Sequence, residues 1–329
     1  MTYSIVAYDP TTHQHAIAVQ TCNLAVGTWV PWAEGGVGAV ATQARAERSY
    51  GTLGLDLMRG GFSAPQALAA LLAADEQREL RQVAMIDRQG RLAQHTGARC
   101  LPEAGMARGE GYATQANMMA RDTVWEAMAA AFEAARGSGQ GDLADWLLAA
   151  LDAAQEEGGD IRGLQTAALV VVGEVARGKG ARLQEASLQG ARATEGWSRE
   201  TDWRVPLVDL RVDHHPQPLS ELRRLLRLHR AYDAQYDIVG LAAIGERERA
   251  YELVQRVLTW APDEDYLHYL CALHLAGALQ RWDEALALLR PLIARRPVWL
   301  EYLRRDASVQ LFGQPGTTGA LYEVLQEEF

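Results

Sequence analysis

Lysine is almost absent from this chain of 329 residues: of its 32 lysines and arginines, only Lys179 is a lysine. This scarcity nearly excludes mechanisms that depend on lysine, such as Schiff-base catalysis or phosphate binding by a P-loop. Cysteine is scarce as well. Cys22, Cys100 and Cys271 are odd in number and far apart in sequence. They give neither a disulfide framework nor a zinc-binding spacing, which fits a reducing compartment.

Excess positive charge and long apolar runs are also missing. The formal net charge is −10, which argues against sequence-independent binding to nucleic acid because such binding needs a basic surface. No apolar run reaches the roughly 18 residues that a membrane-spanning helix requires. The first residues lack the basic and apolar regions of a signal peptide. We therefore expect a cytoplasmic protein with no nucleic-acid partner and no membrane partner.

Hydrophobic residues make up 48% of the chain, which is enough for a large core, and the length fits two domains. Ser63 and Gln66 form a capping-box pattern at the start of a helix that we expect to reach Ala74. The residues of the segment 36–42 are small, which suits a strand that another backbone approaches closely. The other predicted elements are hairpins over 3–8 with 15–21 and over 82–87 with 91–96, strands over 111–116, 165–173 and 205–212, and helices over 118–135 and 142–157.

Hairpin-linked strands with paired helices predict an antiparallel α+β layered fold over residues 1–212. Residues 213–218 are the expected linker, and 219–329 form an all-α domain. In this second domain the spacing from Ala250 to Pro262 recurs from Ala285 to Pro297. It resembles the tetratricopeptide repeat, whose small residue lets two helices pack closely. A generic helical bundle would give a similar sequence.

Thr2 is the residue whose position most directly suggests chemistry. Threonine is small enough for the initiator methionine to be removed before it, which would place a free α-amine beside the threonine hydroxyl. An α-amine titrates near ~8, so it can accept the hydroxyl proton at neutral pH. This arrangement needs neither histidine nor lysine as a base. The segment 3–8 supplies the strand that must start directly after it.

Several ordered motifs resemble a known family, the domain of unknown function 1028. The resemblance covers about two-thirds of the chain and ends near residue 212. It is carried by the segments TYSIVA at 2–7, VPWAEGGVGAVATQA at 30–44, SYG at 49–51, GLDL at 54–57, GEGYATQANMM at 109–119 and GLQTAAL at 163–169. This family is similar to N-terminal-nucleophile hydrolases, so the resemblance implies a four-layer αββα sandwich with Thr2 at the nucleophile position. Its substrate is not generally established.

Relatives of proteasome type use a lysine to keep the nucleophile's amine neutral. Here Lys179 is predicted to lie in the loop after the strand 165–173, so the role is either absent or taken by another cation. Arg45 follows the small-residue strand and is our candidate, because its positive field would lower the pKa of the amine. The alternative for Arg45 is a surface or structural role.

Four further residues have both a functional and a structural interpretation. The Asn117 amide would donate to an oxyanion, or Asn117 is the N-cap of a helix. Gln43 would contact a substrate carbonyl or form core hydrogen bonds. Asp9 would orient the Thr2 amine, although an Asx turn before Pro10 is favoured. Tyr50 is a possible substrate-binding residue and is more often a packing residue.

The sequence predicts no metal site and no cofactor. The adjacent histidines His214 and His215 would point in different directions and lie in the expected linker. The leading hypothesis is a threonine amidohydrolase acting on a small amide-containing substrate, and we expect a homodimer. The alternative is a non-catalytic scaffold whose helical domain binds a protein or peptide partner.

Overall fold

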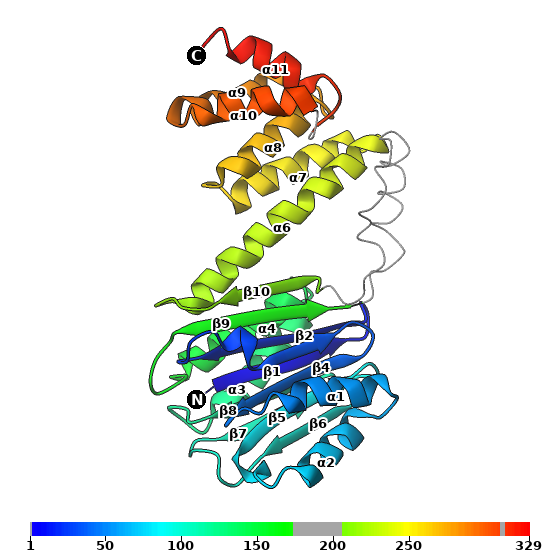
Figure 1. Cartoon of the computed structure of the whole chain (residues 1–329), viewed down its shortest axis with the longest axis vertical. Coiled ribbons are helices and arrows are strands. Elements are labelled where there is room, and N and C mark those ends of the chain that lie inside the picture. The colour runs from blue at the N-terminus through cyan, green and yellow to red at the C-terminus, as the bar shows by residue number, and fades with distance from the viewer. Residues whose placement is uncertain (1, 174–205, 310–312) are drawn as a thin grey trace. The chain divides into compact units, whose positions relative to one another are not determined.

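The computed structural model describes residues 2–173, 206–309 and 313–329 (Figure 1). They divide into two compact units: one holds residues 2–173 and 206–225, and the other holds residues 226–309 and 313–329. The first unit is a mixed α/β structure with antiparallel sheets, and the second is helical. The predicted order along the chain, an α+β region followed by a helical region, is therefore confirmed. Lys179, which the sequence predicts to lie in the loop after the strand 165–173, is outside the described residues.

The first unit contains two antiparallel sheets. The six-stranded sheet has the order β10-β9-β2-β1-β8-β7, and the four-stranded sheet has the order β3-β4-β5-β6. The strands of the six-stranded sheet are β1 (Thr2–Asp9), β2 (Gln14–Thr21), β7 (Gly105–Gly109), β8 (Tyr112–Asn117), β9 (Thr166–Val172) and β10 (Val208–Val212). Those of the four-stranded sheet are β3 (Pro31–Glu34), β4 (Gly38–Ala44), β5 (Arg81–Asp87) and β6 (Leu92–Thr96).

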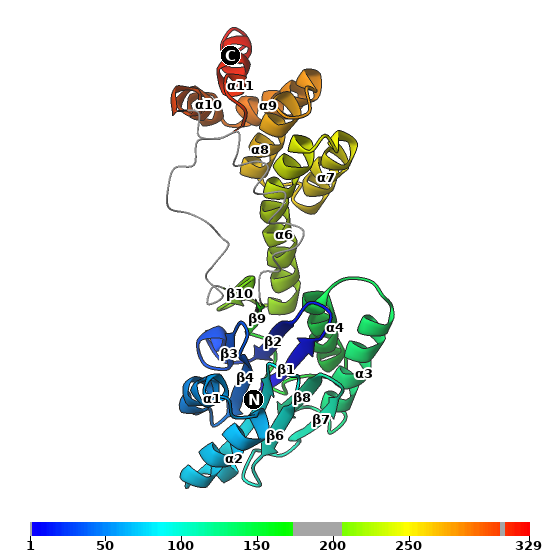
Figure 2. The same cartoon turned by 90° about the vertical axis from the view of Figure 1, so that its right-hand side faces the viewer.

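The two sheets face each other, and a pair of helices covers the outer face of each (Figure 2). Helices α1 (Ser49–Arg59) and α2 (Ala64–Ala74) contact the four-stranded sheet. Helices α3 (Val124–Gly137) and α4 (Leu143–Glu156) contact the six-stranded sheet. Short 3-10 helices, η1 (Val26–Thr28) and η2 (Arg78–Leu80), precede β3 and β5.

Strand β1 is buried on both faces because it lies in the middle of this arrangement. Tyr3 and Ile5 face the helices, and the Tyr3 hydroxyl donates to Gln155 of α4 at 3.3 Å. Val6 faces the other sheet and packs in a core rich in alanine and valine. Small residues let the two sheets approach closely, as the composition of 36–42 predicts. Within the four-stranded sheet, a Cβ atom at Gly38, with φ of 149°, would lie 2.2 Å from the carbonyl oxygen of Ile86 on the neighbouring strand β5, so only glycine fits there.

The predicted hairpins over 3–8 with 15–21 and over 82–87 with 91–96 are confirmed by the β1–β2 and β5–β6 pairs. The capping box at Ser63 and Gln66 is confirmed too. The helix predicted from residue 118 is wrong at its start, because α3 begins at Val124 after the cap residue Thr123. Met118 has φ of 58°, a left-handed conformation that cannot begin a right-handed helix. The interpretation of Asn117 as a helix N-cap is therefore wrong.

In the first unit, the strands β3 and β7 and the helix α1 have no counterpart in the sequence prediction, and neither do the short 3-10 helices η1 and η2. Strands β3 and β7 are only four and five residues long. Most of their residues are only partly buried, and neither segment has a run of apolar residues that would predict a strand. Helix α1 contains two glycines, Gly51 and Gly54, which lower the intrinsic helix propensity of the segment.

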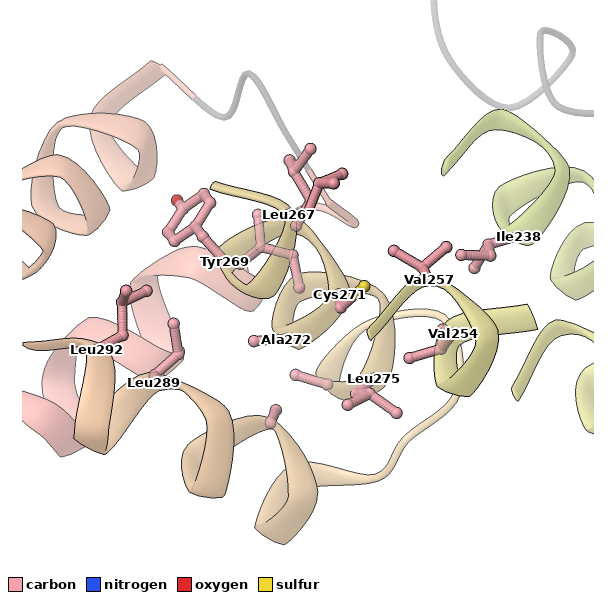
Figure 3. Packing of buried hydrophobic residues seen from close by; sticks show 14 of the residues in the cluster. Ile238, Val254, Val257, Leu267, Tyr269, Cys271, Ala272, Leu275, Leu289 and Leu292 are labelled. Carbon is pink, nitrogen blue, oxygen red and sulfur yellow. The ribbon is translucent and has the colours of Figure 1, made fainter. Parts of the chain in front are cut away.

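The second unit contains the later part of α6 (Pro218–Ala243) and the helices α7 (Arg247–Trp260), α8 (Asp265–Ala276), α9 (Trp282–Arg295), α10 (Val298–Val309) and α11 (Thr317–Leu325). Its core is built on α8, whose residues from Tyr269 to Ala276 are all buried. Figure 3 shows Leu267 and Cys271 of α8 among Val254 and Val257 of α7 and Leu289 of α9. Within the described parts of the chain, no helix is both long enough and apolar enough to cross a membrane.

Candidate functional site at the start of strand β1

Thr2 is the first residue of β1, which lies between β2 and β8 in the six-stranded sheet. It pairs with Asn117, the last residue of β8. On the other side, the Thr2 hydroxyl lies 3.2 Å from the hydroxyl of Thr21, the last residue of β2. Thr2 is only 5% exposed. Because side chains alternate along a strand, Thr2 shares with Ser4 the face that looks toward the other sheet.

Three side-chain amides surround the start of β1: Gln43 of β4, Gln82 of β5 and Asn117 of β8. We call them the amide cluster. The Thr2 carbonyl accepts hydrogen bonds from Gln43 Nε2 at 3.1 Å and from Asn117 Nδ2 at 3.4 Å. All three amide residues are at most 2% exposed. The Thr2 carbonyl is thus held by side chains from both sheets, and these bonds fix the position of the first residue of β1.

Gln82 connects the other two amides. Its Oε1 accepts from Gln43 Nε2 at 2.8 Å and from Asn117 Nδ2 at 2.9 Å. An amide nitrogen carries two hydrogens. Asn117 therefore uses one on Gln82 and the other in its longer bond to Thr2. The cluster itself holds no formal charge.

The amide cluster continues along the space between the sheets. Ser4 Oγ donates to Gln43 Oε1 at 2.6 Å, and Gln115 Nε2 donates to Ser4 Oγ at 3.2 Å. Gln115 Oε1 is buried and has no hydrogen-bond partner among the residues that the structure describes. Beyond these residues the inter-sheet space becomes apolar, with Val6 and Ile17 in its core. The amide cluster and its extension thus occupy the end of the inter-sheet space where Thr2 lies, whereas at the other end His15 contacts the Asp87 carbonyl at 3.0 Å.

Backbone strain gathers at the same end of the sheets. Ala44 has φ of 65° and Met118 has φ of 58°, and they directly follow Gln43 and Asn117. Glu103, with φ of 53°, accepts a hydrogen bond from the Met119 N–H at 3.1 Å. Left-handed conformations cost free energy for residues other than glycine, and they are enriched at functional sites. Here they end the strands that carry two of the three amides.

A buried carboxylate lies beside the end of β2. Asp160 accepts from the Cys22 N–H at 3.0 Å, and it pairs with Arg162 at 3.1 Å. The Asp160 side chain is fully buried, while that of Arg162 is 36% exposed. Since Cys22 follows Thr21 directly, this ion pair supports the strand end that contacts the Thr2 hydroxyl.

Among the predicted site residues, the structure brings Gln43 and Asn117 to Thr2. Arg45 is exposed. Its described contacts are made by its backbone, whose N–H donates to the Leu80 carbonyl at 3.2 Å and whose carbonyl accepts from Arg81 at 2.8 Å. The structure therefore leaves the electrostatic role of Arg45 as a prediction.

Asp9 and Tyr50 lie away from Thr2. Asp9 is at the opposite end of β1, roughly 23 Å along the strand. Its carboxylate accepts from the Thr11 N–H at 2.9 Å and from the Thr12 hydroxyl at 2.7 Å, which is the Asx turn favoured by the sequence. The buried Tyr50 hydroxyl donates to Asp75 at 3.0 Å.

Sequence reasoning missed Gln82, Ser4 and Thr21. A signal for them exists, because each is a polar residue on a strand whose neighbours are mostly apolar: Gln82 precedes Val83-Ala84-Met85, and Ser4 lies between Tyr3 and Ile5. Which of these polar residues meet depends on the pairing of strands across two sheets. No group of three or more potential metal ligands of His, Cys, Asp or Glu occurs in the described ranges.

Two antiparallel sheets that face each other between two pairs of helices define this unit as an α+β protein with a buried polar site between its sheets. The chain belongs to a family of unknown function, DUF1028, whose model matches residues 2–222. The family predicted from the motifs is thereby confirmed.

A DUF1028 protein from Silicibacter pomeroyi has a similar crystal structure, with a TM-score of 0.55 and 28% sequence identity. The similarity covers 69% of this chain and 88% of that chain. None of the curated proteins compared with the chain matches it.

Proposed function

We propose that the first unit is an N-terminal-nucleophile amidohydrolase with the four-layer αββα sandwich of that class, acting in the cytoplasm on a small amide-containing substrate. Thr2 would be the nucleophile after removal of Met1. Met1 must be removed, because the Thr2 nitrogen is an amide as long as Met1 is bonded to it, and an amide nitrogen cannot act as a base.

The reaction follows from the two groups that a first residue carries. The Thr2 Oγ attacks the substrate carbonyl carbon while the α-amine takes the hydroxyl proton. The carbon–nitrogen bond then breaks, and the leaving amine takes that proton from the α-amine. Water attacks the resulting ester and releases the acid, which restores the Thr2 hydroxyl. The step needs no metal and no cofactor.

The observation that carries the proposal is the placement of Thr2 as the first residue of a central strand, with its hydroxyl in the polar space between two sheets. The amide cluster supports it, since Asn117 Nδ2 holds the Thr2 carbonyl through a bond of 3.4 Å. A substrate oxyanion would replace this weak bond and receive the same hydrogen. Arg45 would contribute a positive field, and Gln43 would hold Thr2 in place.

The experiment starts with the intact mass of protein expressed without an N-terminal tag. Loss of one methionine residue is expected. The protein is then treated with a β-lactone, which acylates a reactive hydroxyl by ring opening and adds its whole mass. Thr2→Ala should abolish labelling and hydrolysis of an amide library, whereas Thr2→Ser should keep both.

Thr52→Ala is the matched control, because Thr52 is an exposed residue of α1. Its labelling should equal that of the wild type. Thr2→Ala removes the hydroxyl that bonds to Thr21, and the loss of this hydrogen bond should cost about 1 kcal/mol of stability. Retention of Met1, or unchanged labelling of Thr2→Ala, would reject the proposed function.

For the second unit we propose tetratricopeptide-like helical hairpins that bind a protein or peptide. The support is a correspondence of lengths: α7 and α9 both have 14 residues, and α8 and α10 both have 12. Ala250 and Ala285 are both fully buried. Tyr266 of α8 stacks on Trp299 of α10 with ring centroids 6.3 Å apart. Deleting residues 226–329, which leaves the first unit whole, should remove a partner recovered with the full chain, and an unchanged set of partners would contradict this proposal.

A further inference from the structure

We infer that Gln82 is the positioning residue that fixes Thr2 at the start of β1, because it holds both of the amides that bind the Thr2 carbonyl. The structural part of this inference depends only on the contacts of the amide cluster. Its consequence for catalysis rests on the proposed function.

The shared acceptor fixes the direction of both amides. Gln82 Oε1 takes one hydrogen from Gln43 at 2.8 Å and one from Asn117 at 2.9 Å. The two hydrogens of an amide nitrogen lie in one plane at a fixed angle. Once the first points at Gln82, the direction of the second is set: in Asn117 its acceptor is the Thr2 carbonyl at 3.4 Å, and in Gln43 its acceptors are the carbonyls of Thr2 at 3.1 Å and Gln115 at 3.4 Å.

Gln82 is itself held by both sheets, through Thr96 of its own sheet and two carbonyls of the opposite sheet. Its Nε2 lies 3.0 Å from Thr96 Oγ1, 3.2 Å from the Gly105 carbonyl and 2.8 Å from the Ala116 carbonyl. Gly105 and Ala116 belong to β7 and β8, whereas Gln82 belongs to β5. Gln82 is fully buried, so water does not compete for these bonds. The residue therefore ties the position of Thr2 to both sheets.

The start of β1 needs such support. The first residues of a chain fray unless they are tied down, and removal of Met1 would make Thr2 the terminal residue. A nucleophile must also be held within a few tenths of an ångström of its productive position. Misplacement by about 1 Å can cost about 100-fold in rate.

The test compares Gln82→Met with Gln94→Met in the full chain. Gln94 of β6 is a matched control, because its Nε2 also donates across the sheets, to the carbonyls of Ala107 at 3.3 Å and Thr114 at 2.9 Å. Its described contacts do not include Thr2 or the amide cluster. Both substitutions remove a glutamine that bridges the sheets, and only Gln82→Met releases Thr2.

The first readout is hydrogen exchange, measured by mass spectrometry, in the peptide that covers β1. Gln82→Met should speed exchange at the start of β1 by on the order of tenfold, and Gln94→Met should leave it unchanged. Gln43→Met is the second variant. It removes one of the two donors to the Thr2 carbonyl while Gln82 stays in place, so it should speed exchange at the start of β1 by less than Gln82→Met does. Equal exchange in Gln82→Met and Gln94→Met, or wild-type exchange in Gln43→Met, would overturn the inference.

The second readout is the kinetics of β-lactone labelling. A positioning defect should lower the maximal labelling rate of Gln82→Met by roughly 10-fold to 100-fold and leave the half-saturating probe concentration within about twofold of the wild-type value. An unchanged maximal rate would overturn the catalytic part of the inference. If the wild type is not labelled but the exchange results hold, the proposed function fails and the structural role of Gln82 stands.

Discussion

The outer face of the four-stranded sheet, which α1 and α2 cover, carries a polar group of three residues: Tyr50, Asp75 and Arg81. Asp75 accepts from Arg81 at 2.8 Å and from the Tyr50 hydroxyl at 3.0 Å. The Arg81 side chain is only 7% exposed, and it also reaches the carbonyl of Arg45. These contacts give Tyr50 a structural partner, and they hold the loop that carries Arg45. A tyrosine that the sequence offered as a possible binding residue is thus engaged in packing and hydrogen bonding.

Replacing Asp75 with asparagine should destabilise the first unit by about 3 kcal/mol at pH 7, because the buried guanidinium of Arg81 loses its counter-charge. Urea unfolding measures this cost. Asp56→Asn is the control, since Asp56 pairs with Arg59 at an exposed position, and exposed pairs contribute little. A cost below that of Asp56→Asn would show that the Asp75 pair does not support the fold.

The same residue predicts a pH dependence. The hydrogen bond from Arg81 holds the pKa of Asp75 below its ordinary value. A carboxyl with a lowered pKa in the folded state stabilises the fold above its unfolded pKa, near ~4, and loses that contribution as the pH falls through its folded pKa. Part of the wild-type loss of stability below about pH 4 should therefore be absent in Asp75→Asn. Identical acid sensitivity of the two proteins would contradict this assignment.

At the scale of elements, helix α1 shows why a glycine occurs inside a helix. A Cβ atom on Gly51 would lie 2.2 Å from the indole ring of Trp32 on β3. The helix therefore approaches the sheet more closely than any residue with a side chain would permit. This contact explains the glycine in the segment Ser49–Gly51, one of the motifs by which the sequence resembles its family.

Gly51→Ala should lower the stability of the first unit by about 1–3 kcal/mol, because the methyl group must displace the Trp32 ring. Gly137→Ala is the matched comparison. Gly137 ends helix α3, and a Cβ atom added there would have no neighbouring atom within 4 Å, so alanine should be neutral or stabilising by up to ~1 kcal/mol. Thermal and urea unfolding of both variants measures the difference, and equal effects would show that the close approach has no energetic importance.

At the scale of the whole molecule, the chain is organised as two compact units. The first has its own cores between the sheets and beneath α1 and α2. The second has a core built around α8. The division falls between Leu225 and Leu226, inside α6, whereas the sequence placed a linker at 213–218. The domain limits expected from the sequence, residues 1–212 and 219–329, therefore stay a prediction.

A protein of residues 1–225 should fold by itself, because the apolar core between the sheets and the core beneath α1 and α2 are made of residues of the first unit. We expect a cooperative thermal transition and the circular dichroism of a mixed α/β protein. A chain ending at residue 212 is the comparison. It lacks Leu222, which is fully buried in the full chain, and should unfold at a lower temperature. A non-cooperative transition of the 1–225 protein would contradict the division into units.

The sequence by itself determined the hairpins, the capping box at Ser63 and Gln66, the family and the helical nature of the last third, because these depend on local patterns of apolar and turn residues. It also singled out Thr2 with Gln43 and Asn117. Only the tertiary structure decided that Gln82 joins these residues, because β5 comes beside them through pairing across two sheets. It also placed Asp9 and Tyr50 elsewhere. Distances between strands follow from register and sheet order, which the sequence of a single strand does not contain.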